Sequence, residues 1–107
     1  MSAPDLNQLM EQAREAQSRL AALQRELATR RVEGSAGGGM VSAVVSGDLR
    51  VLEVRFEAEL FNGGDRAMLQ DLTAAAVNSA LANAQRMIQE EMQHASAGLP
   101  LAGLGQG

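Results

Sequence analysis

Arginine supplies every cationic side chain of this 107-residue chain, because lysine and arginine total nine and none is lysine. A guanidinium group donates paired hydrogen bonds to phosphate oxygens, so arginines along one segment suit a nucleic-acid backbone. Five of them lie within the first 33 residues: Arg14, Arg19, Arg25, Arg30 and Arg31. We predict that these five bind DNA phosphates, and that the amides of Gln12 and Gln17 add hydrogen bonds.

A structural role competes with this interpretation of the arginines. Glu15 and Glu26 precede Arg19 and Arg30 by four residues, which is the spacing of ion pairs on a solvated helix face. The formal net charge of −4 also opposes binding to a polyanion. The acidic excess, however, lies mainly in the middle: residues 1–33 carry five arginines and five acids, whereas residues 40–65 carry two arginines and five acids. The first segment therefore remains the expected site of phosphate contact.

No residue pattern indicates catalysis or a bound cofactor. The chain has no cysteine and one histidine, His94, so thiolate chemistry is excluded and a metal site would lack ligands. The run Gly37–Gly39 lacks the lysine and hydroxyl of a phosphate-binding loop and precedes a predicted strand, which favours a turn. Serines, threonines and acids form no recognisable motif. We predict no enzymatic activity, small-molecule substrate, metal or cofactor.

The kind of nucleic acid follows from the scarcity of aromatic residues. Phe56 and Phe61 are the only rings, so single-stranded bases have no series of side chains on which to stack. No helix-turn-helix or zinc-finger pattern is present either. We therefore predict double-stranded DNA as the partner, recognised through backbone contacts and shape.

A long helix must hold the arginines of the first segment. Apolar residues there follow one another in steps of three and four, a heptad pattern typical of a helix that packs lengthwise on another helix. The positions are Leu6, Leu9, Ala13, Ala16, Leu20, Leu23 and Leu27. We predict a helix over about residues 4–31, roughly 42 Å long, with Arg30 and Arg31 in its last turn.

Three short strands are predicted over about residues 32–60. The runs 32–36 and 40–45 are separated by glycines, and Ser46-Gly47-Asp48 is a turn sequence. In the next run apolar and charged residues alternate, as in a strand with one buried face. The apolar members are Leu52, Val54 and Phe56. Tight turns between consecutive strands predict a small antiparallel sheet.

A second long helix is predicted over about residues 66–94, with Asp65 as its N-cap. Gly98 and Pro100 end it, so residues 1–97 form one predicted domain and 98–107 a flexible tail. Each helix would be roughly 42–43 Å long, whereas a compact chain of this size would have a radius of gyration of roughly 13 Å. The helices would therefore protrude from such a globule. A second copy is the simplest cover for the protruding helices and the sheet edge, so we predict an α+β protomer of order α-β-β-β-α in a homodimer.

Four stretches of the sequence carry a family resemblance: LNQLMEQAREAQ (6–17), VEGSAGGGMVSAVVSGDLRVLEVRF (32–56), LQDLTAAAVNSALANAQRMIQEEM (69–92) and GLPLAGLGQG (98–107). The most specific pieces are VEGSAGGGMV (32–41) and AAVNSAL (75–81). Through these stretches, which follow one another with similar spacing, nearly the whole chain resembles the YbaB/EbfC family of bacterial nucleoid-associated proteins. The resemblance implies an intertwined homodimer joined through its sheet region, with the first and last helices protruding like the arms of tweezers. It places the dimer interface on the apolar strand residues Val41, Ala43, Val45, Leu52, Val54 and Phe56.

The same resemblance implies that the protein binds double-stranded DNA, alters its conformation, associates with the nucleoid and modulates gene expression. The chain departs from the family where relatives often carry lysine, in the first helix and second strand, and fewer cations weaken phosphate binding. An alternative is a dimeric scaffold that grips a protein partner, which the acidic charge and the apolar helix stripes favour. No secretion signal or membrane-length apolar run is recognised, so the expected location is the cytoplasm.

Overall fold

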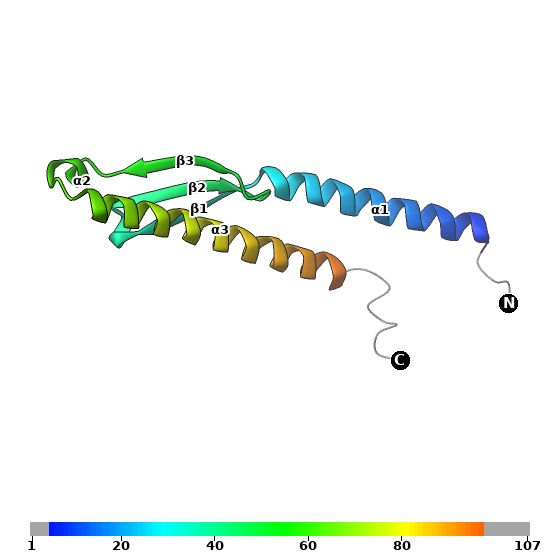
Figure 1. Cartoon of the computed structure of the whole chain (residues 1–107). Coiled ribbons are helices and arrows are strands. Elements are labelled where there is room, and N and C mark those ends of the chain that lie inside the picture. The colour runs from blue at the N-terminus through cyan, green and yellow to red at the C-terminus, as the bar shows by residue number, and fades with distance from the viewer. Residues whose placement is uncertain (1–4, 98–107) are drawn as a thin grey trace.

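The computed structural model describes residues 5–97, which form two long helices joined by a small sheet (Figure 1). In chain order the elements are α1 (Leu6–Thr29), β1 (Arg31–Ala36), a 3-10 turn (Gly37–Gly39), β2 (Val41–Ser46), β3 (Val51–Phe56), α2 (Glu59–Asn62) and α3 (Arg66–Ala97). The predicted α+β class and the order α-β-β-β-α are confirmed. The short helix α2 is the one element in this range that the sequence pattern does not predict.

The sheet is a three-stranded antiparallel meander in the order β1-β2-β3. Gly34 of β1 pairs with Ala43 of β2, and Ala43 pairs in turn with Val54 of β3. A register shift lies between Val44 and Val45. Because side chains alternate between the two faces of a strand, Ala43 and Val45 share one face while Val44 lies on the other.

The core lies between one face of the sheet and α3, which packs on β1 and β2. On the sheet side the fully buried residues are Val41, Ala43 and Val45, and on the helix side they are Ala76, Ala80 and Ala84. Helix and sheet approach closely because these helix residues are small. A Cβ atom added at Gly34 would overlap the backbone of Ala80, so only glycine is compatible with this contact.

Three of the residues predicted to form the dimer interface lie in the core between the sheet and α3. Val41, Ala43 and Val45 have 0% exposed surface within the single chain, because α3 covers them. Within the described chain they are core residues of the protomer. The sequence pattern identifies them correctly as buried, but it does not reveal that the covering surface belongs to the same chain. The expectation that Leu52, Val54 and Phe56 share a buried face of β3 is wrong for Leu52 and Phe56, which are exposed, while Val54 is partly buried against the core. The register shift beside Val45 breaks the alternation at Leu52, and β3 lies at the edge of the sheet.

Helix α1 is shorter than predicted at both ends. Its N-cap is Asp5, whose side chain accepts a hydrogen bond from the Asn7 amide, and its last residue is Thr29. Arg30 has an extended backbone and Arg31 begins β1, so the expectation that both lie in the last helical turn is wrong. The helix stops because the β2–β3 turn occupies its C-terminal end: the amides of Gly47 and Asp48 donate to the carbonyls of Arg30 and Ala28, at 3.0 and 3.2 Å.

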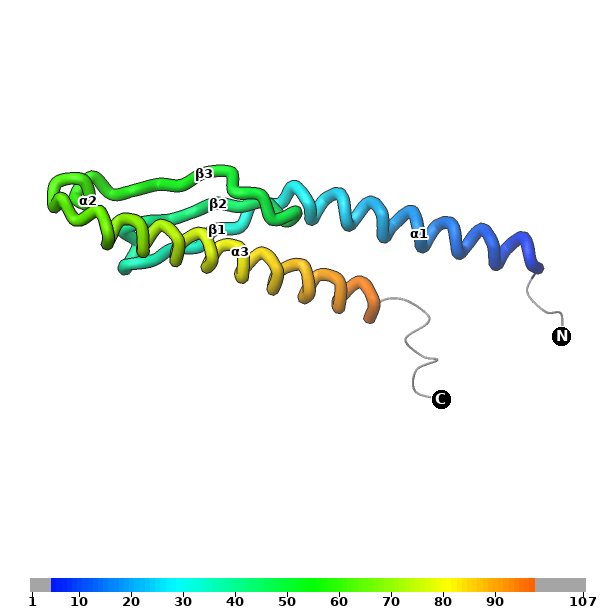
Figure 2. The backbone as a smooth tube through the Cα atoms, viewed as in Figure 1, coloured from blue at the N-terminus to red at the C-terminus, as the bar shows by residue number. Residues whose placement is uncertain are grey.

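Beyond this attachment, α1 projects away from the sheet and past the end of α3 (Figures 1 and 2). Leu27 is its single buried residue. Leu6, Leu9 and Leu20 of the heptad pattern are 68%, 46% and 39% exposed. The molecule is accordingly long and thin, with extents of 77 × 25 × 14 Å and a radius of gyration of 21.2 Å. A compact chain of this length would have a radius of gyration of about 13 Å.

Helix α3 begins as predicted, with Asp65 accepting a hydrogen bond from the Met68 amide at 3.0 Å. It continues to Ala97, three residues past the predicted end. The predicted flexible tail, 98–107, lies outside the described residues. In the part of the chain that the structure describes, no helix is both long and apolar enough to cross a membrane.

Candidate nucleic-acid interface

Arg14 and Arg25 form one side of the α1 surface. They are eleven residues apart, which corresponds to about 20° around the helix and roughly 16 Å along it. Both are exposed, and they lie on the side of α1 away from the heptad leucines, by helical spacing. Neither takes part in an ion pair within residues 5–97. Their guanidinium groups are therefore available to an external anion.

Arg19 and the two glutamines lie near this surface but on other sides of α1. Arg19 is paired with Glu15 at 3.7 Å, and both side chains are largely exposed, so the pair holds the guanidinium weakly. Gln12 lies two turns before Arg19 on nearly the same side, whereas Gln17 falls on the opposite edge of the leucine stripe. Both glutamines are exposed, but the structure does not bring them together.

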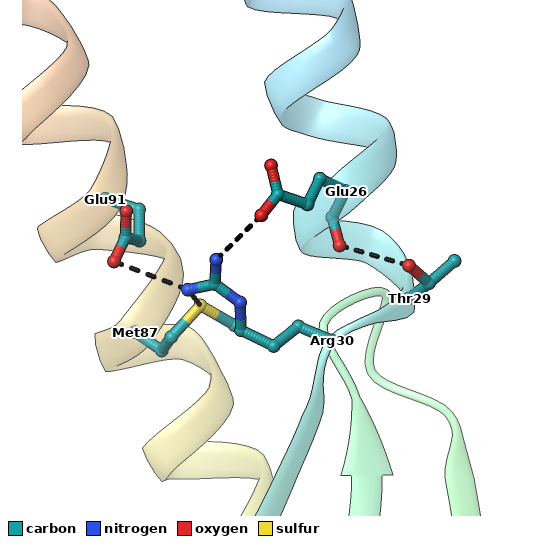
Figure 3. A network of polar contacts seen from close by, with 5 residues as sticks. All are labelled: Glu26, Thr29, Arg30, Met87 and Glu91. Atoms are coloured by element: carbon teal, nitrogen blue, oxygen red, sulfur yellow. Dashed lines mark hydrogen bonds and ion pairs between the residues drawn. The ribbon is translucent and has the colours of Figure 1, made fainter.

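Arg30 is bound to the protein itself, at the junction of α1 and α3 (Figure 3). Its guanidinium lies 3.1 Å from the Glu26 carboxylate on α1 and 3.3 Å from the Glu91 carboxylate on α3. One of its nitrogens also donates to the sulfur of Met87, at 3.7 Å. This side chain links the two helices and is poorly placed to bind phosphate.

Arg31 also forms an ion pair within the protein, on the face of the sheet opposite α3. It pairs with Glu53 at 3.3 Å, and Glu53 pairs with Arg55 at 2.8 Å. The hydrogen bond from Arg55, together with the positive charges of Arg55 and Arg31, lowers the pKa of Glu53 below its ordinary value. The same bond raises the pKa of Arg55. The five predicted arginines thus divide into three on the projecting part of α1 and two that are used in structural ion pairs.

The edge of the sheet at β3 is a second exposed feature. Strand β3 bonds only to β2, so its outer backbone groups have no strand partner within residues 5–97. Large apolar side chains along and beside this strand are exposed: Leu49, Val51, Leu52, Phe56 and Phe61. Phe56 and Phe61 contact each other edge-to-face, with ring centroids 5.7 Å apart. The opposite edge strand, β1, is tied to α3 by the Asn83 amide, which donates to the Glu33 carbonyl.

Neither the complete bridge at Arg30 nor the full exposed group around β3 was predictable from the sequence. The Glu26–Arg30 half of the bridge is visible as a four-residue spacing, but Glu91 is distant in sequence and only folding brings it near. Leu49 and Val51 carry no periodic signal because they flank the turn and the register shift. Among residues 5–97, no group of three histidine, cysteine or acidic side chains is arranged to hold a metal ion.

The sequence and the fold of this chain are similar to those of known proteins. Residues 1–99 match the YbaB/EbfC DNA-binding family. A nucleoid-associated protein of Desulfotalea psychrophila is 40% identical over 100 residues, covering 94% of each chain. A nucleoid-associated protein of Syntrophobacter fumaroxidans is 44% identical over 95 residues, covering 89% of this chain and 86% of that one. The crystal structure of an uncharacterized protein from Helicobacter pylori superimposes with a TM-score of 0.67 at 17% identity, over 86% of this chain and 97% of that one, which supports the fold alone.

Proposed function

This chain belongs to the YbaB/EbfC DNA-binding family, and we propose that it binds double-stranded DNA as a homodimer, through the phosphate backbone. Its curated relatives are named nucleoid-associated proteins, so the proposed location is the nucleoid of the bacterial cytoplasm. The proposal includes a change in DNA conformation and a modulation of gene expression, and it assigns the chain no enzymatic activity. One observation carries it: α1 projects from the sheet with Arg14 and Arg25 exposed and unpaired within residues 5–97.

The charge distribution supports contact through α1 rather than through the sheet. Arg14 and Arg25 on one side of the helix are well placed to contact phosphates separated by several base pairs, because phosphates on one strand follow at about 3.4 Å along the duplex axis. Arg19 joins them at small cost, since an exposed ion pair such as Arg19–Glu15 contributes at most about 1 kcal/mol. The acidic excess of residues 40–65 lies around the sheet and directs the duplex away from it.

The dimer is proposed to form at β3. A second copy can cover both the free edge of β3 and the exposed apolar group beside it. A twofold axis at this edge places β3 of one protomer against β3 of its partner, so the same residues meet from both sides. The interface then contains Leu52, Val54 and Phe56 from the predicted set, together with Leu49 and Val51. Such a dimer presents the α1 arginines twice, which favours bridging or clamping of a duplex over a single contact.

The test is a salt titration of duplex binding by the parent chain and two matched variants. Arg14→Gln/Arg25→Gln removes two unpaired arginines from α1, and Arg66→Gln/Arg86→Gln removes two from α3. We expect the parent's affinity to fall steeply with salt. The slope of log affinity against log salt should decrease by about 0.9 for each lost phosphate contact in the α1 variant only. Single-stranded DNA serves as the second control, and sedimentation verifies that each variant keeps the parent's oligomeric state.

Two results would contradict the proposal: duplex affinity that is unchanged between low and physiological salt, or equal slopes for the two double variants. A second function, a scaffold that grips a protein partner, is favoured by the exposed leucines Leu6, Leu9 and Leu20 of α1. A parent protein that dimerises yet binds no duplex at low salt would support that function instead.

A further inference from the structure

A groove runs between α1 and the last turns of α3. Its volume is about 360 Å³, and its lining is mostly apolar: Ala16, Gln17, Arg19, Leu20, Leu23, His94 and Ala95. A second cavity of about 270 Å³ lies nearer the base of α1, beside Leu27, Ile88 and Met92. Leu20 is 39% exposed in this surface. Apolar surface left in water costs about 25 cal/mol per Å², so the groove favours an apolar occupant.

The chain supplies an apolar segment at the end of this groove. Helix α3 ends at Ala97, two residues after the groove residue Ala95, and residues 98–107 follow with the sequence GLPLAGLGQG. These ten residues contain three leucines and no charged side chain. A solvated tail is normally rich in charge, whereas this composition gains by leaving water. Glycine and proline also disfavour a continued helix.

We propose that residues 98–107 dock in an extended conformation in the groove between α1 and α3, and that this contact braces α1. Leu99 and Leu101 fall on the same side of an extended chain, so both face the groove together. The segment is long enough, because ten extended residues span up to roughly 33 Å. The stretch of α1 from Leu23 to Leu9 is about 21 Å long.

The segment of the same chain is favoured over a second copy because of its attachment. It starts at the groove, and a short tether raises the effective concentration to about the millimolar range, so a weak contact is enough to hold it. The inference does not depend on DNA binding. Docking covers Gln17 and the aliphatic stem of Arg19, which line the groove, while the Arg19 guanidinium stays in solvent and Arg14 and Arg25 on the other side of α1 remain accessible.

A single tryptophan tests the docking, because the full chain contains no tryptophan or tyrosine. In Leu101→Trp we expect emission at shorter wavelength than free tryptophan and slower quenching by acrylamide. Adding Leu20→Glu should reverse both changes, while the matched substitution Ser18→Glu, on the side of α1 away from the groove, should not. Solvent-like emission in Leu101→Trp would overturn the proposal, as would an equal effect of the two glutamates.

Engineered cysteines then identify which chain occupies the groove, since the sequence has no cysteine of its own. Leu20→Cys/Leu101→Cys should oxidise to a disulfide within one chain, with faster migration on a non-reducing gel. The control pair Ser18→Cys/Leu101→Cys should link much more slowly. Absence of a link, or a link between two chains, would overturn docking in the same molecule. Circular dichroism of both pairs before oxidation verifies the helix content, so a failed link is not attributed to unfolding.

Discussion

Helices α1 and α3 have similar residue types but opposite surroundings. The 32-residue α3 buries Ala76, Ala80 and Ala84 against the sheet, whereas the 24-residue α1 buries Leu27 alone. The helix with the regular leucine pattern is thus the exposed one, and the alanine-lined helix is the core element. A residue is buried here when its helix lies close to the sheet. Such a close approach requires small side chains on the helix opposite Gly34.

The two helices use their apolar residues differently. Ala76, Ala80 and Ala84 of α3 permit close approach of the helix backbone to the sheet, and each of the three has no exposed surface. Leu6, Leu9 and Leu20 of α1 have no such partner within residues 5–97, so their apolar surface is exposed, and the proposed docking segment would cover Leu20. Stability should therefore depend on α3, and function on α1.

The largest expected effect comes from making the same substitution in both helices. Ala80→Leu forces three extra carbons into a contact without free space and should lower the free energy of unfolding by about 3 kcal/mol or more. Ala13→Leu, at an exposed position of α1, should change it by less than about 0.5 kcal/mol. Urea denaturation followed by circular dichroism measures both. Similar losses in the two variants would show that α1 is packed as tightly as α3.

A smaller effect is expected at the bridge between the two helices. Arg30→Gln and Glu91→Gln each remove one side of a pair that is about one-third exposed, 37% for each side chain. A double-mutant cycle should give a coupling energy of roughly 0.5 kcal/mol. Hydrogen exchange of the amides in α1 should become faster in both single variants, because this pair links α1 to α3. A coupling energy of zero, with exchange unchanged, would show that the β2–β3 turn alone positions α1.

The smallest expected change in stability concerns Glu53 on the sheet. This carboxylate pairs with Arg31, whereas Arg14 on α1 has no ion pair within residues 5–97. Glu53 has a lowered pKa in the folded chain, so its ion pairs stabilise the fold above the ordinary glutamate range and lose this contribution as the pH falls through the lowered pKa. Glu53→Gln should therefore be slightly less stable than the parent at neutral pH and equal to it in acid. Thermal unfolding across that range measures the difference, with Glu57→Gln, an exposed carboxylate without an ion pair in the described residues, as the control. A difference that persists in acid would mean that Glu53 acts through packing.

Much of the architecture was predictable from local patterns. The glycine and turn residues located β1 and β2 to within one residue, and Asp65 marked the start of α3. The predicted strand region ended at about residue 60, whereas β3 ends at Phe56 and α2 follows. The end of α1 was not predictable, because residues 30 and 31 continue a helical composition and it is the amides of Gly47 and Asp48 that stop the helix. Glu26 was found as a partner of Arg30 through its spacing, while Glu91 was not, since it lies on the other helix.

Local patterns were enough to predict the class of fold, the two long helices, the buried face of β2 and the segment that carries the arginines, because helix and strand periodicity and residue charge are local properties. Which helix covers the sheet depends on the folded arrangement of the whole chain. The same arrangement covers Val41, Ala43 and Val45 with their own chain, and within residues 5–97 it pairs Arg30 and Arg31 but not Arg14 and Arg25. Those outcomes depend on contacts between residues far apart in the chain, which no local pattern records.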